Sequence, residues 1–198
     1  MSPRITLASG SASRRALLAG AGIDAESIKP NVDEDAARAA MRAEGMSVRD
    51  QAMQLAELKA IKVSARTPGL VIGGDQMLSL ENEAFDKPAD LDAARDHLRK
   101  LSGKTHTLET AIVICENGTP VWRHLARPKL TVRELSDAFV DSYVERAGEA
   151  LLSTVGAYQL EGLGAQLFTK IEGDYFSILG LPLLPLLDYL RTRGVIST

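Results

Sequence analysis

The sequence predicts an α/β fold in which helices flank a mixed sheet. Segments with strand character alternate with segments of helical periodicity along the chain. Residues 70–74, Leu-Val-Ile-Gly-Gly, form an apolar run that is typical of a central strand covered on both faces. Asn117-Gly118 separates the apolar stretches 107–115 and 121–125, which indicates an antiparallel hairpin. The sheet is therefore expected to be mixed.

The first half of the chain alternates short strands with helices. Gly22 can close the first helix, and Ser47 with Asp50 has the spacing that starts a long helix. In chain order we expect a strand at 5–8, a helix at 13–21, a strand at 25–29, an acidic loop at 31–35, a helix at 47–65 and the strand at 70–74.

The second half is expected to contain two hairpins and three helices. Gly103 and Gly194 follow helical patterns and can end them. The expected elements are a hairpin of 77–80 with 83–85, a helix at 90–102, the hairpin around Asn117-Gly118, a helix at 137–146 and a last helix at 182–190. No flexible linker is visible, so we expect a single domain over residues 1–198, in which a boundary near residue 100 would divide two lobes rather than form a tether.

Composition excludes several functional classes. The net charge of −3 does not favour non-specific binding to nucleic-acid polymers or anionic membranes. Cys115 is the only cysteine, so no intramolecular disulfide can form. Residues 1–8 lack the apolar segment of a signal peptide, and no apolar run reaches the roughly 18 residues of a membrane span. We expect a cytoplasmic protein without membrane or nucleic-acid-polymer partners.

Residues 7–15, Leu-Ala-Ser-Gly-Ser-Ala-Ser-Arg-Arg, lead from a strand through small residues into a helix. Small residues let a ligand approach the backbone, and a helix start offers unpaired N–H donors. Arg14 and Arg15 in the first turn oppose the helix dipole unless an anion such as phosphate binds there. The residues alone fit phosphate binding about as well as a solvated arginine pair.

Asp75 follows the apolar run and two glycines. Open α/β sheets bind ligands at the ends of their strands. A carboxylate there can hold a divalent cation, accept a proton from water, or do both in turn. Gly73 and Gly74 would leave room for a ligand to come close. Considered alone, a turn with an aspartate cap explains these residues slightly better.

Other charged residues have two interpretations each. Lys59 lies on the apolar stripe of its helix, so it either extends to water or points into a site. Lys87 lies in the turn 86–88 and would bind phosphate only if that turn faces a ligand. The acidic residues 33–35 would be solvated by default, but they could also supply metal ligands.

Taken together, these segments resemble the Maf family of nucleotide pyrophosphatases. The resemblance covers nearly the whole chain in order, and eight motifs in register are specific although no single one is decisive. Ala12 departs from the family pattern, in which proline is usual at this position. The motifs are residues 7–15, 31–34, 73–76, 86–88, 101–103, 155–158, 171–175 and 180–183.

The resemblance implies two lobes around a cleft, as in the inosine-triphosphate pyrophosphatases, and often a homodimer. It implies hydrolysis of a nucleoside triphosphate to the monophosphate and pyrophosphate with a divalent cation such as Mg²⁺, Mn²⁺ or Co²⁺. Carried over by position, Asp75 would be the general base or the acidic side chain that binds the metal, and Glu34 would support the metal or the water. The implied triphosphate-binding residues are Ser9, Arg14, Lys59 and Lys87.

Three positions bear on the choice of base: Ser13, Gln76 and Glu161. In the branch that resembles dTTP/UTP enzymes they are typically Arg, Thr and Gln, and in the branch that prefers 7-methyl-GTP they are typically Trp, Gln and Glu. Gln76 and Glu161 resemble the second branch, and Ser13 resembles neither. A carboxylate at 161 could pair with the positive charge of 7-methylguanine. The absence of a ring at 13 removes a stacking partner worth roughly 1–3 kcal/mol.

A non-catalytic nucleotide-binding regulator of cell division is the competing function. Binding alone does not need a carboxylate beside the phosphates, so the residues favour the enzyme. The resemblance implies a house-cleaning hydrolase that removes modified or non-canonical nucleotides such as 7-methyl-GTP.

Overall fold

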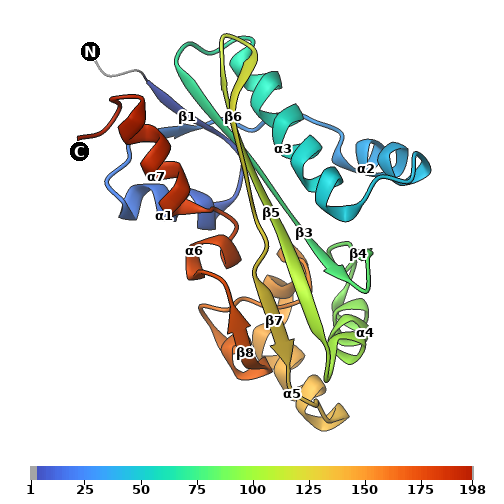
Figure 1. Ribbon diagram of the computed structural model, residues 1–198. Helices are drawn as coiled ribbons and strands as arrows, with labels where there is room; N and C mark the ends of the chain where they lie inside the picture. Colours follow the sequence, from blue (N-terminus) through green and yellow to red (C-terminus); the bar gives the residue numbers. More distant parts are fainter. Residues whose placement is uncertain (1–3, 198) are drawn as a thin grey trace. The chain divides into compact units, whose positions relative to one another are not determined.

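The computed structural model describes residues 4–197 and has α/β architecture (Figure 1). Among these residues, eight strands form one mixed sheet with the hydrogen-bonded order β2-β1-β3-β5-β7-β8, while β4 pairs with β3 and β6 pairs with β5. The predicted mixed sheet with flanking helices is confirmed. Residues 1–3 of the N-terminal stretch, on which the prediction about a signal peptide partly rests, lie outside the described residues. No helix within residues 4–197 has the length and apolar character that a membrane crossing needs.

The strands are β1 (Ile5–Ala8), β2 (Ala25–Ser27), β3 (Leu70–Leu80), β4 (Glu83–Phe85), β5 (Thr105–Glu116), β6 (Thr119–Ala126), β7 (Lys129–Val132) and β8 (Phe168–Glu172). The α-helices are α1 (Ala12–Gly20), α2 (Glu34–Ala43), α3 (Val48–Ser64), α4 (Leu91–Leu101), α5 (Asp137–Ala147), α6 (Tyr175–Ile178) and α7 (Leu183–Thr192). Within residues 4–197, 3₁₀ helices cover Gly148–Ser153 and Leu163–Leu167.

The chain divides into two compact units, and strands β3 and β5 each continue from one into the other. The first unit comprises Met1–Gln76, Thr110–Ala126 and Asp174–Thr198, and the second comprises Met77–Glu109 and Arg127–Gly173. The chain passes between the units within β3 and β5 and again near residues 127 and 173, so no single boundary near residue 100 separates them. The single domain over residues 1–198 stays a prediction.

Alternation along β3 gives the first unit two buried layers. Leu70 and Ile72 pack in a cluster with Leu186 of α7, whereas Val71 packs with Val63 of α3. Successive side chains of a strand point to opposite faces. Helix α3 therefore covers one face of β3, and the cluster with α1 and α7 covers the other (Figure 1).

Gly73 is required for the close packing of α3 on β3. A Cβ atom at this position would lie 2.3 Å from the carbonyl oxygen of Ala56 and 2.7 Å from the backbone nitrogen of Ala60. The space that the sequence interpretation reserved for a ligand at Gly73 is thus filled by the backbone of α3. Any larger residue would force the helix away from the strand.

Several element boundaries differ from the expectation. Strand β3 continues to Leu80 rather than ending at Gly74, since Met77, Leu78 and Leu80 extend its buried pattern. The expected acidic loop is the start of α2, where Asp33 caps the helix by accepting a hydrogen bond from the backbone of Ala36 at 3.0 Å. Carboxylates in a first turn are favourable because they oppose the positive end of the helix dipole. Strands β7 and β8 were not expected.

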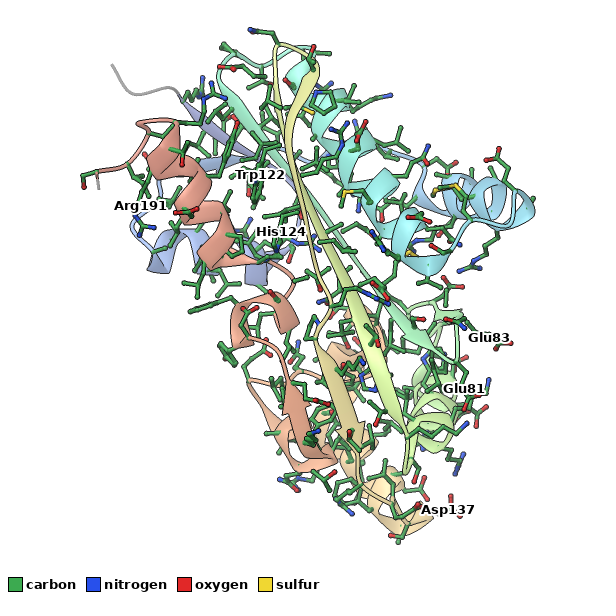
Figure 2. The ribbon with its side chains drawn as sticks, viewed as in Figure 1. Glu81, Glu83, Trp122, His124, Asp137 and Arg191 are labelled. Atoms are coloured by element: carbon green, nitrogen blue, oxygen red, sulfur yellow. The ribbon has the colours of Figure 1, made fainter. Side chains whose placement is uncertain are left out.

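Helix α7 is attached to the hairpin β5–β6 by aromatic and ionic contacts. Trp122 stacks on Tyr189 with ring centroids 5.0 Å apart and on His124 at 5.7 Å (Figure 2). Arg193 donates to the hydroxyl of Tyr189 and pairs with Glu116 at 2.9 Å. The C-terminal segment is thereby fixed to the first unit.

The core of the second unit contains a buried histidine. His106 Nε2 lies 2.7 Å from the hydroxyl of Tyr158, and both rings lie against Phe168. Burial lowers the pKa of His106 to about 4 and raises the pKa of Tyr158. His106 is therefore neutral in the folded protein at neutral pH.

This histidine should make the protein less stable in mild acid. Below pH 6.5 the unfolded chain protonates His106 but the folded chain does not, so the free energy of unfolding falls between pH 6.5 and about 4. The loss should approach about 3 kcal/mol, and it is absent above pH 6.5. Urea unfolding across this range, compared for the wild type and His106→Gln, measures it. Parallel pH curves for the two proteins would contradict the prediction.

Candidate active site

Asp75 lies just beyond the carboxyl end of β1, within the longer strand β3. The parallel pairing of β1 with β3 ends where Ala8 faces Gly73, and β3 continues past that point. The interpretation of residues 73–75 as a turn is therefore wrong, since they lie in a strand. Asp75 nevertheless borders the carboxyl end of a parallel strand, which is where α/β sheets bind ligands.

Strand alternation sends Asp75 and Gln76 to opposite faces of β3. Asp75 shares its face with Val71 and so points toward α3, where Lys59 lies. Gln76 shares its face with Ile72 and points toward the C-terminal segment, where it bonds to Ser177.

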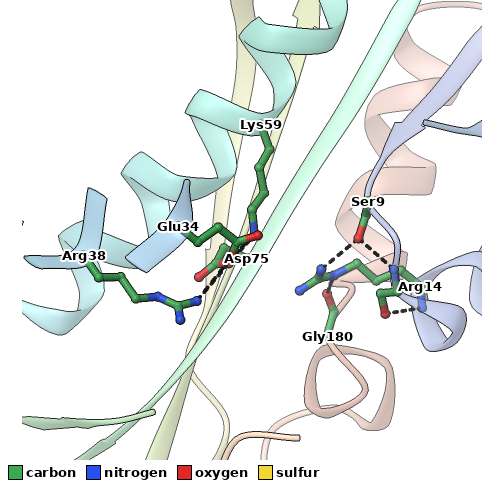
Figure 3. A network of polar contacts seen from close by, with 8 residues as sticks. Ser9, Arg14, Glu34, Arg38, Lys59, Asp75 and Gly180 are labelled. Carbon is green, nitrogen blue, oxygen red and sulfur yellow. Dashed lines mark hydrogen bonds and ion pairs between the residues drawn. The ribbon is translucent and has the colours of Figure 1, made fainter. Parts of the chain in front are cut away.

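Four charged side chains meet on the α3 face, and we call Glu34, Arg38, Lys59 and Asp75 the charge cluster (Figure 3). Lys59 Nζ lies 2.7 Å from Asp75 Oδ1 and 2.9 Å from Glu34 Oε2. Arg38 Nη2 lies 3.3 Å from Glu34 Oε2 and 3.9 Å from Asp75 Oδ1. Each cation thus faces both carboxylates, and the formal charges of the cluster cancel.

Two buried polar atoms of the charge cluster have no hydrogen-bond partner among residues 4–197. They are Asp75 Oδ2, an acceptor, and Arg38 Nε, a donor. Asp75 is only 3% exposed, so water does not readily replace the missing partner. Buried polar groups are nearly always hydrogen-bonded, and exceptions often mark a functional site.

The two carboxylates are suited to a hard divalent cation. No group of three or more His, Cys, Asp or Glu side chains that could hold a metal occurs in the described part of the chain. Mg²⁺, however, is commonly bound by only one or two carboxylates together with substrate phosphates and water. The unpartnered Oδ2 of Asp75, with Glu34 beside the same lysine, fits that donor set.

Arg14 is held by the loop after β1 and by the C-terminal segment. Its Nε donates to the carbonyl oxygen of Gly180 at 2.7 Å, and its Nη1 donates to Ser9 Oγ at 3.2 Å (Figure 3). Burial lowers the pKa of Arg14, and the negative charges of Asp75 and Glu34 offset this lowering only in part. The guanidinium is therefore a fixed cation within the electrostatic range of the charge cluster.

Gln76 is anchored by its side-chain nitrogen. Nε2 donates to Thr110 Oγ1 at 2.8 Å and to the carbonyl oxygens of Ser177 and Ile178 at 3.0 Å each. Carbonyl oxygens only accept hydrogen bonds, which fixes the orientation of the amide. Contact of Gln76 with a ligand in this arrangement would therefore use its oxygen.

The structure brings together three of the residues that the sequence singled out: Asp75, Glu34 and Lys59. It adds Arg38, which the sequence interpretation missed. The available signal was the spacing of four between Glu34 and Arg38, which places both on one face of a helix.

The remaining candidates lie outside the charge cluster. Ser13 is half-buried in α1, next to Arg14. Lys87 and Glu161 belong to the second unit, and both are exposed there. Their roles in substrate binding stay predictions.

The family described as Maf-like protein matches residues 4–193. The chain belongs to the Maf family. A relative named nucleoside triphosphate pyrophosphatase, from Hyphomonas neptunium, is 72% identical over all of both chains, and one of the same name from Caulobacter vibrioides is 53% identical over 98% of this chain and 97% of its own. A relative named 7-methyl-GTP pyrophosphatase, from Mesorhizobium japonicum, is 51% identical over the full length of both. The resemblance to the Maf family in the sequence is thus confirmed.

Lys59 should stabilise the fold of this Maf-family chain as the counter-ion of Asp75. Lys59→Met removes the closest positive charge and leaves a buried carboxylate poorly compensated, which should lower the free energy of unfolding by about 3 kcal/mol at pH 7. Lys62→Met, an exposed site on the same helix, is the control and should change stability by less than about 0.5 kcal/mol. Equal unfolding midpoints in urea for the two variants would show that Lys59 has no such role.

Proposed function

We propose that this protein hydrolyses nucleoside triphosphates to the monophosphate and pyrophosphate. The observation that carries the proposal is the buried Asp75, whose Oδ1 accepts a hydrogen bond from Lys59 and whose Oδ2 has no partner in the described part of the chain. A carboxylate that is held in place and still has an accepting oxygen can position or deprotonate a water molecule. The names of the relatives support the same reaction class.

The proposed roles follow from charge and position. Asp75 orients the attacking water, and Glu34 supports it from the same cluster. The proposed ligands of the triphosphate are Ser9, Arg14, Lys59 and Lys87. A divalent cation held by Asp75 and Glu34 would neutralise charge on the phosphate oxygens when bound. Lys59 Nζ has three hydrogens, so its contacts with the two carboxylates leave it a donor for phosphate.

We further propose that Gln76 and Glu161 contribute to the choice of base. Glu161 offers a carboxylate, and Gln76 offers its amide oxygen because its nitrogen is already bonded. Acceptors of this kind suit the N1 and N2 hydrogens of a guanine edge, and a carboxylate suits the positive charge of 7-methylguanine. Ser13 supplies no aromatic ring, so discrimination against other bases should be weaker than a stacking site would give.

The biological role that we propose is removal of modified or non-canonical nucleotides in the cytoplasm. A homodimer is the proposed assembly, because the resemblance to the family implies one. Neither a membrane nor a nucleic-acid polymer is a proposed partner. A non-catalytic regulator would bind nucleotide in the same place, and the products formed separate the two functions.

Replacing Asp75 tests the reaction. Asp75→Asn keeps the size of the side chain but loses the basic oxygen, and it should lower pyrophosphate release at least about a hundredfold. The assay incubates a panel of canonical and modified triphosphates with Mg²⁺, Mn²⁺ or Co²⁺ and separates pyrophosphate from phosphate. Asp188→Asn, an exposed carboxylate on α7, is the control and should retain full activity. A folded Asp75→Asn protein with near-normal turnover would contradict the catalytic role of Asp75. A wild-type protein that binds nucleotide but releases no pyrophosphate would favour the regulator.

Replacing Glu161 tests the choice of base. Glu161→Gln removes the negative charge, so kcat/KM for 7-methyl-GTP should fall about tenfold more than kcat/KM for UTP. Glu149→Gln, another exposed site in the second unit, should leave the ratio of the two substrates unchanged. Equal losses on both substrates would refute the charge-pairing argument.

A further inference from the structure

We propose that Arg38 is a further phosphate-binding residue of this site, which holds the phosphate chain of the substrate and of the product pyrophosphate. The inference deepens the proposed function and rests on it for the identity of the ligand. Arg38 lies on α2, one turn after Glu34, and its side chain is 15% exposed.

The two cations of the charge cluster are held differently. Lys59 contacts both carboxylates at hydrogen-bonding distances of 2.7 and 2.9 Å. Arg38 contacts the same oxygens at 3.3 and 3.9 Å, and the second distance is too long for a hydrogen bond. Lys59 is therefore the main counter-ion of Asp75, and Arg38 keeps donors for another partner.

The buried Nε of Arg38 is a hydrogen-bond donor, so the group that would bind it is a hydrogen-bond acceptor. A buried N–H donor needs an acceptor, and none of the described residues supplies one. Nε–H and Nη2–H form one edge of the guanidinium, which matches two oxygens of a phosphate in a paired arrangement. Because Nη2 of this edge lies 3.3 Å from Glu34 Oε2 and 3.9 Å from Asp75 Oδ1, a phosphate bound there would lie near the central acid.

The same edge of the guanidinium could instead pair with Asp75, and this alternative predicts no effect of Arg38 on phosphate affinity. Asp75 Oδ2 also lacks a partner, so a small movement could pair the guanidinium edge with Asp75 itself. Arg38 would then only lock the acid in place, and phosphate affinity would not depend on the paired donors.

Calorimetric titration of the full chain with inorganic pyrophosphate, in the presence of Mg²⁺, separates these two roles of Arg38. Arg38→Ala should weaken the Kd by about tenfold or more, since a charged paired contact is lost. Arg38→Lys should recover only part of this, because lysine keeps the charge but not the two-donor edge. Arg42→Ala removes the same charge from an exposed position on the same helix and should leave the Kd within about twofold.

Steady-state kinetics provides the second measurement. Arg38→Ala should raise KM for the triphosphate more than it lowers kcat, whereas Asp75→Asn should act on kcat. Wild-type affinity for pyrophosphate in a folded Arg38→Ala protein would overturn the proposal, as would a wild type that does not bind pyrophosphate. If Arg38→Ala does not fold, full recovery of the Kd by Arg38→Lys would equally overturn the role of the paired donors. A wild type that binds pyrophosphate through Arg38 but releases none from triphosphates would refute the proposed function and leave this inference standing.

Discussion

The buried ion pair between Lys59 and Asp75 is the contact on which the site depends. Taking two charges out of water is costly, so such a pair is maintained only where the surrounding elements hold the partners closely. Here β3 presents Asp75 toward α3, and the missing side chain of Gly73 lets α3 approach the strand. The same packing that completes one layer of the first unit therefore sets the 2.7 Å distance of the pair.

Strand β3 supports a charged cluster on one face and a hydrogen-bonded network on the other, because its successive side chains point to opposite faces. On the α3 face, Asp75 belongs to a cluster of opposite charges. On the other face, the neighbouring Gln76 is bonded to carbonyl oxygens at Ser177 and Ile178, and Arg14 reaches Gly180. Residues 101 to 166 positions apart in the sequence are thereby joined next to the acid. A shift of one residue in the register of β3 would exchange the two faces and destroy both arrangements at once.

The sequence was sufficient to predict those structural features that depend on neighbouring residues alone. The apolar run before Asp75, the Asn-Gly hairpin and the capping residue Ser47 each specify a local structure, and all three are found. The continuation of β3 past Gly74 was not predictable in this way, because two glycines and an aspartate favour a turn until neighbouring strands supply hydrogen bonds. Arg38 was missed for a related reason. Its significance comes from α2 packing near α3, a long-range contact that the spacing of Glu34 and Arg38 along α2 does not reveal.

The charge balance of the site gives a physical reason to expect a cation with the substrate. Glu34 and Asp75 cancel Arg38 and Lys59, so within this cluster no net positive charge is available to a triphosphate. Arg14 adds one positive charge, which is small compared with the several negative charges of a triphosphate chain. A divalent cation on the two carboxylates would change this balance in two ways. It would add its own charge, and it would compete with Lys59 and Arg38 for the carboxylate oxygens, so that both side chains could turn their donors toward phosphate.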